Sequence, residues 1–107
     1  MEMASQVDIE DFVSELNSVF GDRLAKVILY GSYARGEATP GSDIDLLLLV
    51  KDKKKGDRLK ALDIANKFFE ERELLFSPRV MEKETFNEKL DKNYGFHKEV
   101  AQQGVEI

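Results

Sequence analysis

Cysteine and tryptophan are absent from the 107-residue sequence, and histidine occurs only once. Without cysteine the chain can form neither a disulfide framework nor a thiolate metal site. The single histidine, His97, argues against a zinc site, and we expect it at the surface or on the flank of a helix. The longest apolar run, Leu46–Val50, is too short to span a membrane. Residues 1–8 lack the pattern of a signal peptide, so we expect a cytoplasmic protein.

Positive charge is also in the minority, because 16 lysines and arginines stand against 21 aspartates and glutamates and the net charge is −5. This balance argues against strong non-specific binding to nucleic acid, which requires many phosphate contacts from lysine and arginine. One basic run exists, Lys51–Lys55. The simpler interpretation is a solvated loop between a strand and a helix. The alternative is a rim that attracts phosphate groups to a neighbouring binding site.

The length fits one domain, so we expect a single domain over residues 1–107. Apolar residues at helical spacing predict a first helix that stops near Gly21. Lys26–Tyr30 and Ile44–Val50 have the composition of buried strands. A helix is expected to begin at Gly56. The predicted fold is α/β (α+β), with a small mixed sheet of three to four strands flanked by helices.

The second half of the sequence predicts a further strand over Leu74–Met81. Pro78 cannot donate a hydrogen bond to a ladder, so this strand should lie at a sheet edge. Thr85 and Glu88 fit a capping box for a short helix, and a last helix should end at Gly104. Two further expectations concern side chains: the inner face of the helix that begins at Gly56 should carry Leu59, Leu62, Ala65 or Asn66, and Phe69, and both Phe68 and Phe69 should belong to the core.

Two aspartates stand at the start of the second predicted strand. Asp43 and Asp45 are two positions apart, so their side chains share one face of the strand. Two like charges held side by side are unfavourable unless a cation neutralises them. Mg²⁺ fits, because it takes oxygen ligands and is commonly held by one or two carboxylates with substrate phosphates. The pair therefore predicts a magnesium site, with two ions possible.

A turn with the character of a phosphate cradle precedes these aspartates. Gly31 follows a buried strand, where glycine lets the backbone approach a ligand closely. Ser32 can cap a short helix and contact a phosphate oxygen, and Arg35 can add charge-assisted contacts. Ser42 is expected to brace the turn that presents Asp43. We therefore expect a nucleotide-binding set of Gly31, Ser32, Arg35 and Ser42 opposite the metal-binding aspartates.

The segment Gly31–Asp45, GSYARGEATPGSDID, resembles the signature of the DNA polymerase β-like nucleotidyltransferase superfamily. It is most similar to the minimal nucleotidyltransferases, whose pattern is G-S-x-A-R-G, a short spacer and then S-D-x-D-L. The matching residues are Gly31, Ser32, Ala34, Arg35, Gly36, Ser42, Asp43, Asp45 and Leu46. The order of helices and strands is similar over nearly the whole chain.

This resemblance implies transfer of a nucleoside monophosphate from an NTP, most plausibly AMP from ATP, with release of pyrophosphate. Asp43 and Asp45 would be the catalytic and metal-binding residues. It also implies a partner, a helical protein of the HEPN type that is often a toxin, with this chain as its antitoxin. The acceptor would be a hydroxyl group of that partner, and a homo- or hetero-oligomer is possible.

The sequence departs from the family pattern in one respect, because members with full activity bring a third carboxylate from the next strand. Here that strand has no acidic residue in its middle, and only Glu73 and Glu82 flank it. Two alternatives therefore stay open. The chain could be a nucleotide-binding or toxin-masking subunit with weak or no turnover, or it could transfer a nucleotide to a small molecule.

Overall fold

Four strands form one mixed sheet in the order β3-β2-β1-β4 in the computed structural model, which describes residues 3–107. β1 pairs antiparallel with both β2 and β4, and β2 pairs parallel with β3. The elements in chain order are α1 (Gln6–Phe20), a 3-10 helix η1 (Gly21–Arg23), β1 (Leu24–Tyr30), α2 (Ser32–Arg35), β2 (Ile44–Val50), α3 (Asp57–Arg72), β3 (Phe76–Glu82), α4 (Lys83–Asp91), α5 (Gly95–Gln103) and β4 (Val105–Glu106). The predicted fold class is thereby confirmed.

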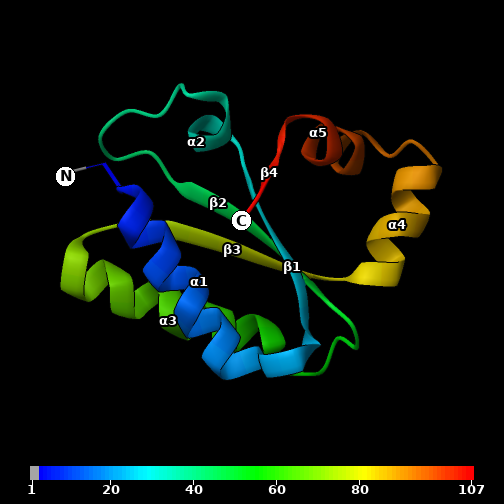
Figure 1. Cartoon of the computed structure of the whole chain (residues 1–107), viewed down its shortest axis with the longest axis horizontal. Helices are drawn as coiled ribbons and strands as arrows, with labels where there is room; N and C mark the ends of the chain where they lie inside the picture. The colour runs from blue at the N-terminus through cyan, green and yellow to red at the C-terminus, as the bar shows by residue number, and fades with distance from the viewer. Residues whose placement is uncertain (1–2) are drawn as a thin grey trace.

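Helices cover both faces of the sheet (Figure 1). Alternate residues of β2 point to opposite faces, and the leucine-rich run serves both. Leu46 and Leu48 belong to the cluster beneath α1 and α3, whereas Leu47 and Leu49 belong to a smaller cluster beneath α4 and α5. The central strand is therefore apolar on both sides because it is buried on both sides.

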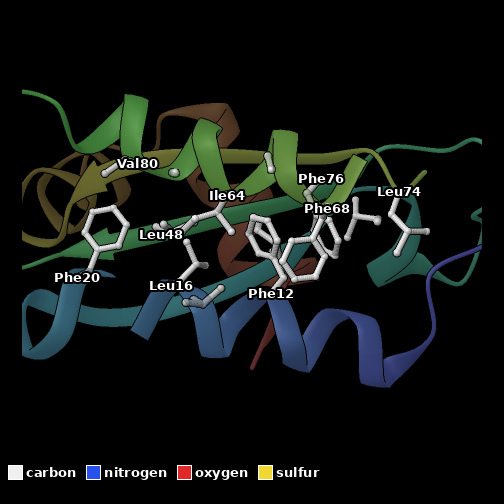
Figure 2. Close-up of a cluster of buried hydrophobic side chains, with 14 of the residues drawn as sticks. Phe12, Leu16, Phe20, Leu48, Ile64, Phe68, Leu74, Phe76 and Val80 are labelled. Carbon is white, nitrogen blue, oxygen red and sulfur yellow. The ribbon is translucent and has the colours of Figure 1, made fainter. Parts of the chain in front are cut away.

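Aromatic side chains fill the larger cluster, between α1, α3 and the sheet (Figure 2). The ring of Phe12 stacks on Phe76, with ring centroids 4.0 Å apart. Phe68 meets both rings edge-on, at 5.2 and 5.4 Å. Buried aromatic pairs of this kind add about 0.5–1.5 kcal/mol each beyond the burial of their area. This cluster holds the first two long helices against the sheet.

The inner face of α3 differs from the expected one. Leu59 and Phe69 are 62% and 44% exposed, and the buried residues are Asp57, Ala61, Ile64, Ala65 and Phe68. Compared with the expected face, α3 is rotated about its axis so that Asp57 is buried. The Asp57 carboxylate is 1% exposed and forms a two-point ion pair with Arg23, at 2.8 and 3.0 Å. The buried positions follow Asp57 at helical spacing, so this polar anchor sets which apolar stripe faces the sheet.

The C-terminal half confirms some expectations and corrects others. Pro78 lies in β3, which is an edge strand as predicted, although the strand runs from Phe76 to Glu82. Helix α4 begins directly after β3 with Glu82 as its N-cap, so the expected capping box of Thr85 and Glu88 does not form. The helix starts two residues earlier than Thr85 because it continues from the strand without a loop.

The last segment returns the chain to the sheet. Helix α5 ends at Gly104 as predicted, and the two-residue strand β4 then pairs with β1. The backbone N–H of Ile107 donates to the carbonyl of Val27 at 2.9 Å. Of the helices between residues 3 and 107, none combines the length and apolar character needed to cross a membrane.

The histidine prediction was wrong. His97 is buried, at 6% exposed, in the smaller apolar cluster under α5. Its ring lies 5.3 Å from that of Phe86 and 5.5 Å from that of Phe96. Neither ring nitrogen has a hydrogen-bond partner among residues 3–107. Its polar neighbours along the sequence, Lys98 and Glu99, suggested the surface, but the ring lies on the apolar side of the helix.

Candidate functional site

The turn between β1 and α2 brings the backbone against an aspartate. Gly31 has φ 76° and ψ −154°, a conformation that residues with a side chain rarely adopt. A Cβ atom at this position would also collide with Oδ2 of Asp45. Glycine is therefore required twice, for its backbone angles and for the close approach of the carboxylate. The structure thus places Gly31 and Asp45 in contact although they are far apart in the sequence.

Ser32 has a different local role from the expected one. It is the first residue of α2, Gly31 occupies the N-cap position, and no side chain caps the helix. The helix is a single turn that ends at Gly36, and the N–H of Glu37 returns to the carbonyl of Ser32 at 2.9 Å. The Ser32 hydroxyl is half-buried beside this turn.

Ser42 braces the turn that leads into β2. Its N–H donates to the carbonyl of Thr39 at 2.9 Å, and its Oγ accepts from the N–H of Thr39 at 2.9 Å. Two opposed bonds close residues 39–42 into a rigid turn, in agreement with the expected bracing. Asp43 follows as an exposed residue, and Asp45 is half-buried in the strand. The two carboxylates share the sheet face that α5 covers.

Burial and like charge both act on Asp45. Partial burial raises the pKa of the Asp45 carboxyl above its usual value, and the charge of Asp43 raises it further. The Arg35 guanidinium opposes this rise only weakly. Arg35 is instead held by Glu37, whose carboxylate accepts from Nε at 2.6 Å. The aspartate pair thus carries repulsion that a bound cation would relieve.

The neighbouring strands decide what stands beside Asp45. Tyr30 of β1 and Ser77 of β3 lie directly opposite it in register, so all three side chains point to the same face. Ser77 therefore occupies the position from which β3 would present a third carboxylate. In the segment from residue 3 to 107, no group of three or more acidic, histidine or cysteine side chains is placed to hold a metal.

The two flanking glutamates do not fill this position. Glu82 pairs in register with Val50, at the far end of β2 from Asp45, and its carboxylate accepts from the N–H of Lys53 at 3.2 Å. Five residues of strand correspond to about 16 Å. Glu73 ends α3 in a left-handed conformation before β3 begins, and its side chain is exposed. The basic run Lys51–Lys55 also follows β2 at this far end, which excludes its alternative role as a rim of the aspartate site.

Helix α5 forms a wall of the site that the sequence did not indicate. A pocket of about 190 Å³ lies beside Gly31 and is lined by Tyr30, Gly31, Phe96, Glu99, Val100 and Gln103. The rings of Tyr30 and Phe96 meet edge to face at 5.6 Å, and the guanidinium of Arg79 lies 4.3 Å from the centre of the Phe96 ring. Burial raises the pKa of Tyr30, the charge of Asp45 adds to the rise, and Arg79 opposes it.

Of the aromatic and charged residues just named, only Tyr30 could have been assigned to the site from the sequence, because it directly precedes the Gly31 turn. Phe96 and Arg79 lie far from the motif along the chain and reach it through strand pairing and the return of α5. In Figure 1, α2 and α5 lie at the same end of the sheet, away from the loop that joins β2 to α3.

Comparison with known proteins identifies the family of this chain. Residues 8–106 match the family model of the nucleotidyltransferase domain. The chain belongs to this family. Among relatives of this nucleotidyltransferase, three proteins of Methanocaldococcus jannaschii carry the name "Putative protein adenylyltransferase". One is 36% identical over 102 residues, which cover 95% of this chain and 96% of the relative. A second is 34% identical over 90 residues, with 81% and 91% covered.

Solved structures share the fold of the nucleotidyltransferase. A mutant of the MntA–HpeT toxin–antitoxin has a TM-score of 0.58 at 22% identity, with 92% of this chain and 70% of that chain covered. A toxin–antitoxin crystallised with AMP-PNP has a TM-score of 0.59 at 20% identity, with 91% and 70% covered. A further MntA–HpeT mutant carries glutamate in place of two aspartates that are two positions apart. At such identities the likeness concerns the fold.

Proposed function

We propose that this nucleotidyltransferase moves AMP from ATP to a hydroxyl group of a partner protein. The acceptor oxygen would form a bond to the α-phosphorus, and the bond from that phosphorus to pyrophosphate would break. The hydroxyl proton would pass to water. The contact of Gly31 with Asp45 carries the proposal, since it sets a glycine turn against one carboxylate of the Asp43–Asp45 pair. The adenylyltransferase names of the relatives and the AMP-PNP bound in a neighbouring fold support the choice of nucleotide.

The donor set fits Mg²⁺. Asp43 and Asp45 offer carboxylate oxygens on one face. Partial burial and, second, the charge of Asp43 raise the pKa of Asp45, and a bound cation would favour its ionised form. Bound there, Mg²⁺ would neutralise charge on the triphosphate. Gly31 and Ser32 would hold the phosphates through the turn, Ser42 would keep Asp43 in place, and Arg35 would exchange Glu37 for a phosphate oxygen.

We infer that the partner is a helical toxin of the HEPN type and that this chain acts as its antitoxin. The toxin–antitoxin assemblies among the structural neighbours support this assignment. The chain itself supports it as well, because the pocket beside Gly31 is small and offers little surface for an acceptor. The acceptor hydroxyl would therefore be presented by the partner.

The decisive experiment is transfer of label from ATP labelled on its α-phosphate. The wild-type chain is incubated with Mg²⁺ and the helical protein encoded beside it, and labelled partner is detected on a gel. Asp43→Ala should abolish the label, whereas Asp63→Ala, which removes an exposed carboxylate on α3, should leave it unchanged. Label that survives in Asp43→Ala would contradict the proposed role of the aspartates.

A second candidate function, a nucleotide-binding mask with little turnover, is favoured by Ser77 standing opposite Asp45. Ser77→Asp would add a carboxylate at this position, with Ser77→Asn as the matched uncharged control. If the missing acid limits transfer, Ser77→Asp should speed labelling by about 100-fold or more, the scale of general-base catalysis, and Ser77→Asn should not. Neutralisation of the toxin by a chain that binds Mg-ATP but labels nothing would instead establish the mask.

A further inference from the structure

A basic groove runs along the outer edge of the sheet. Its volume is about 500 Å³, and five consecutive residues of β3, Pro78–Glu82, form its floor. Its walls come from the loop after β2, from α3 and from α4. The residues that line these walls are Lys53, Arg58, Thr85 and Lys89. The groove therefore lies where one more strand could join the sheet.

The backbone of β3 is available for pairing at this edge. The carbonyl of Leu75 accepts from the N–H of Ile44 on β2 at 2.8 Å, so odd-numbered residues direct their backbone groups toward β2. Even-numbered residues direct theirs outward, because consecutive residues of a strand alternate. Pro78, which has no N–H, is outward-facing as expected, and Val80 presents both an N–H and a carbonyl. Among the strands between residues 3 and 107, none pairs with this side of β3.

Four cationic side chains gather here in a chain whose net charge is −5. They are Lys53, Arg58, Arg79 and Lys89, and none forms an ion pair with any residue from 3 to 107. Of the residues from 3 to 107, Glu82 is the one carboxylate that lines the groove, and it already accepts from the N–H of Lys53. The charge of the described groove residues is therefore mostly of one sign, and the further contacts of these cations include those of Arg79 with the Phe96 ring and of Lys89 with the Tyr94 ring.

The cations lie on both sides of the strand edge. Arg58 belongs to α3, which covers one face of the sheet, and Lys89 belongs to α4, which covers the other. A strand added at this edge would direct successive side chains to these two faces in turn. Acidic side chains on both faces of such a strand would meet a cation.

We propose that this groove binds an extended, acidic segment of a partner protein by strand addition to β3. Main-chain hydrogen bonds to Val80 would supply affinity, and the four cations would select carboxylates. A polynucleotide would use the charges but neither the open backbone edge nor the apolar floor formed by Val80 and Met81. The observations therefore favour a peptide.

The groove adjoins the candidate site without being part of it. Arg79 lines the groove, and its guanidinium also reaches Tyr30, the register partner of Asp45. Arg79 pairs in register with Leu47, two residues from Asp45 along β2, and thus lies at the end of the groove nearer the aspartates. Binding in the groove requires neither nucleotide nor transfer, so its test is independent of the proposed function.

The test uses fluorescence anisotropy with the whole chain and a labelled short peptide of alternating glutamate and valine. Two control peptides carry lysine in place of glutamate, or the same acidic sequence with alternate amides methylated on nitrogen. We expect the acidic peptide to bind, and binding to weaken at high salt. The lysine peptide should not bind, and the methylated peptide should bind at least tenfold more weakly, because its backbone cannot pair.

The matching protein variants reverse the wall charges. Arg58→Glu with Lys89→Glu should weaken binding at least tenfold, whereas Lys98→Glu, an exposed lysine on α5 outside the groove, should leave it unchanged. Binding of the acidic peptide no stronger than of the lysine peptide would overturn the proposal. Equal binding of the methylated peptide would overturn strand addition, and tighter binding of a single-stranded oligonucleotide of equal charge would overturn the choice of a peptide.

Discussion

At the scale of single residues, the site depends on one glycine and the carboxylate that it admits. The contact between Gly31 and Asp45 requires glycine at position 31, since any side chain there would displace the Asp45 carboxylate. Gly36, at the other end of the same helical turn, also has a positive φ of 71°, but a Cβ there would meet nothing within 4 Å. Gly36, at ψ 22°, lies in the ordinary left-handed region, whereas Gly31, at ψ −154°, lies in a region that essentially only glycine adopts. Gly31 is therefore constrained both by its backbone angles and by the close approach of Asp45.

We predict that Gly31→Ala destabilises the protein more than Gly36→Ala. Left-handed strain costs Gly36→Ala about 1–2 kcal/mol. Gly31→Ala combines backbone angles that essentially only glycine adopts with a collision with Asp45. Denaturant unfolding of the two variants measures the difference. Label transfer should fall at least tenfold in Gly31→Ala and stay near wild type in Gly36→Ala. Equal losses in both variants would contradict the role of the close approach.

At the scale of elements, buried polar groups set how helices sit on the sheet. Asp57, at the start of α3, accepts from both nitrogens of the Arg23 guanidinium and from the N–H of Lys54 at 2.7 Å. Arg23 also donates to the carbonyl of Asp52 at 2.8 Å, so the pair ties η1, the basic loop and α3 together. Removal of one partner leaves a buried charge uncompensated.

We predict that Arg23→Ala lowers the free energy of unfolding by about 3 kcal/mol at pH 7. The hydrogen bonds from Arg23 hold the pKa of Asp57 below its usual range. The stability from the pair is therefore fully present above the unfolded pKa of about 4 and is lost as pH falls through the lower folded value. Denaturant unfolding at pH 7 and at low pH measures both effects. A loss unchanged at low pH would contradict this account.

His97 of α5 is also a buried polar residue, but unlike Asp57 it has no hydrogen-bond partner among residues 3–107. Burial lowers the pKa of His97, and the charges of Lys89 and Arg79 lower it further. The unfolded chain then binds a proton more readily, so stability falls as pH drops through the unfolded pKa of about 6.5. We predict that His97→Leu reduces the slope of stability against pH between about 5 and 7, measured as the thermal midpoint. An unchanged slope would show that other groups produce it.

At the scale of the whole molecule, the fold brings the motif, the adjoining end of β1 and two distant elements, β3 and α5, to one end of the sheet. The antiparallel β1–β2 pair sets Tyr30 beside Asp45, the parallel β2–β3 pair adds Ser77, and α5 closes the side near Gly31. This arrangement holds like charges together at the expense of stability. Replacing Asp45 should therefore increase the stability of the fold while it decreases activity.

We predict that Asp45→Asn raises the thermal midpoint of the metal-free protein by a few degrees while it lowers transfer by about 100-fold or more. The raised pKa means that ionised Asp45 destabilises the fold, an effect that sets in as pH rises above the unfolded value near 4. Mg²⁺ should raise the midpoint of the wild type only, because its ligands must be ionised. Asp63→Asn serves as control, and a lower midpoint in Asp45→Asn would contradict the prediction.

The sequence by itself determined the family, the fold class and the local units of the site. Spacing of two along a strand is enough to put Asp43 and Asp45 on one face, and apolar periodicity is enough to locate α1 and β2. These features are local, so neighbouring residues specify them. The absence of a third carboxylate is also visible in the sequence of the third strand. The face of α3 and the burial of His97, in contrast, depended on contacts between distant segments.

Only the tertiary structure decided which side chains meet at the aspartates. Strand order and register place Ser77 opposite Asp45 and carry Glu82 to the far end of β2. Ala61, Ile64, Ala65 and Phe68 of α3 are at helical spacing, as are the residues of the expected stripe, and the buried Arg23–Asp57 pair lies on the face that the structure buries. Pairing between strands far apart in the chain is set by burial of the whole sheet, and therefore the wall that α5 adds to the site appears only in the folded molecule.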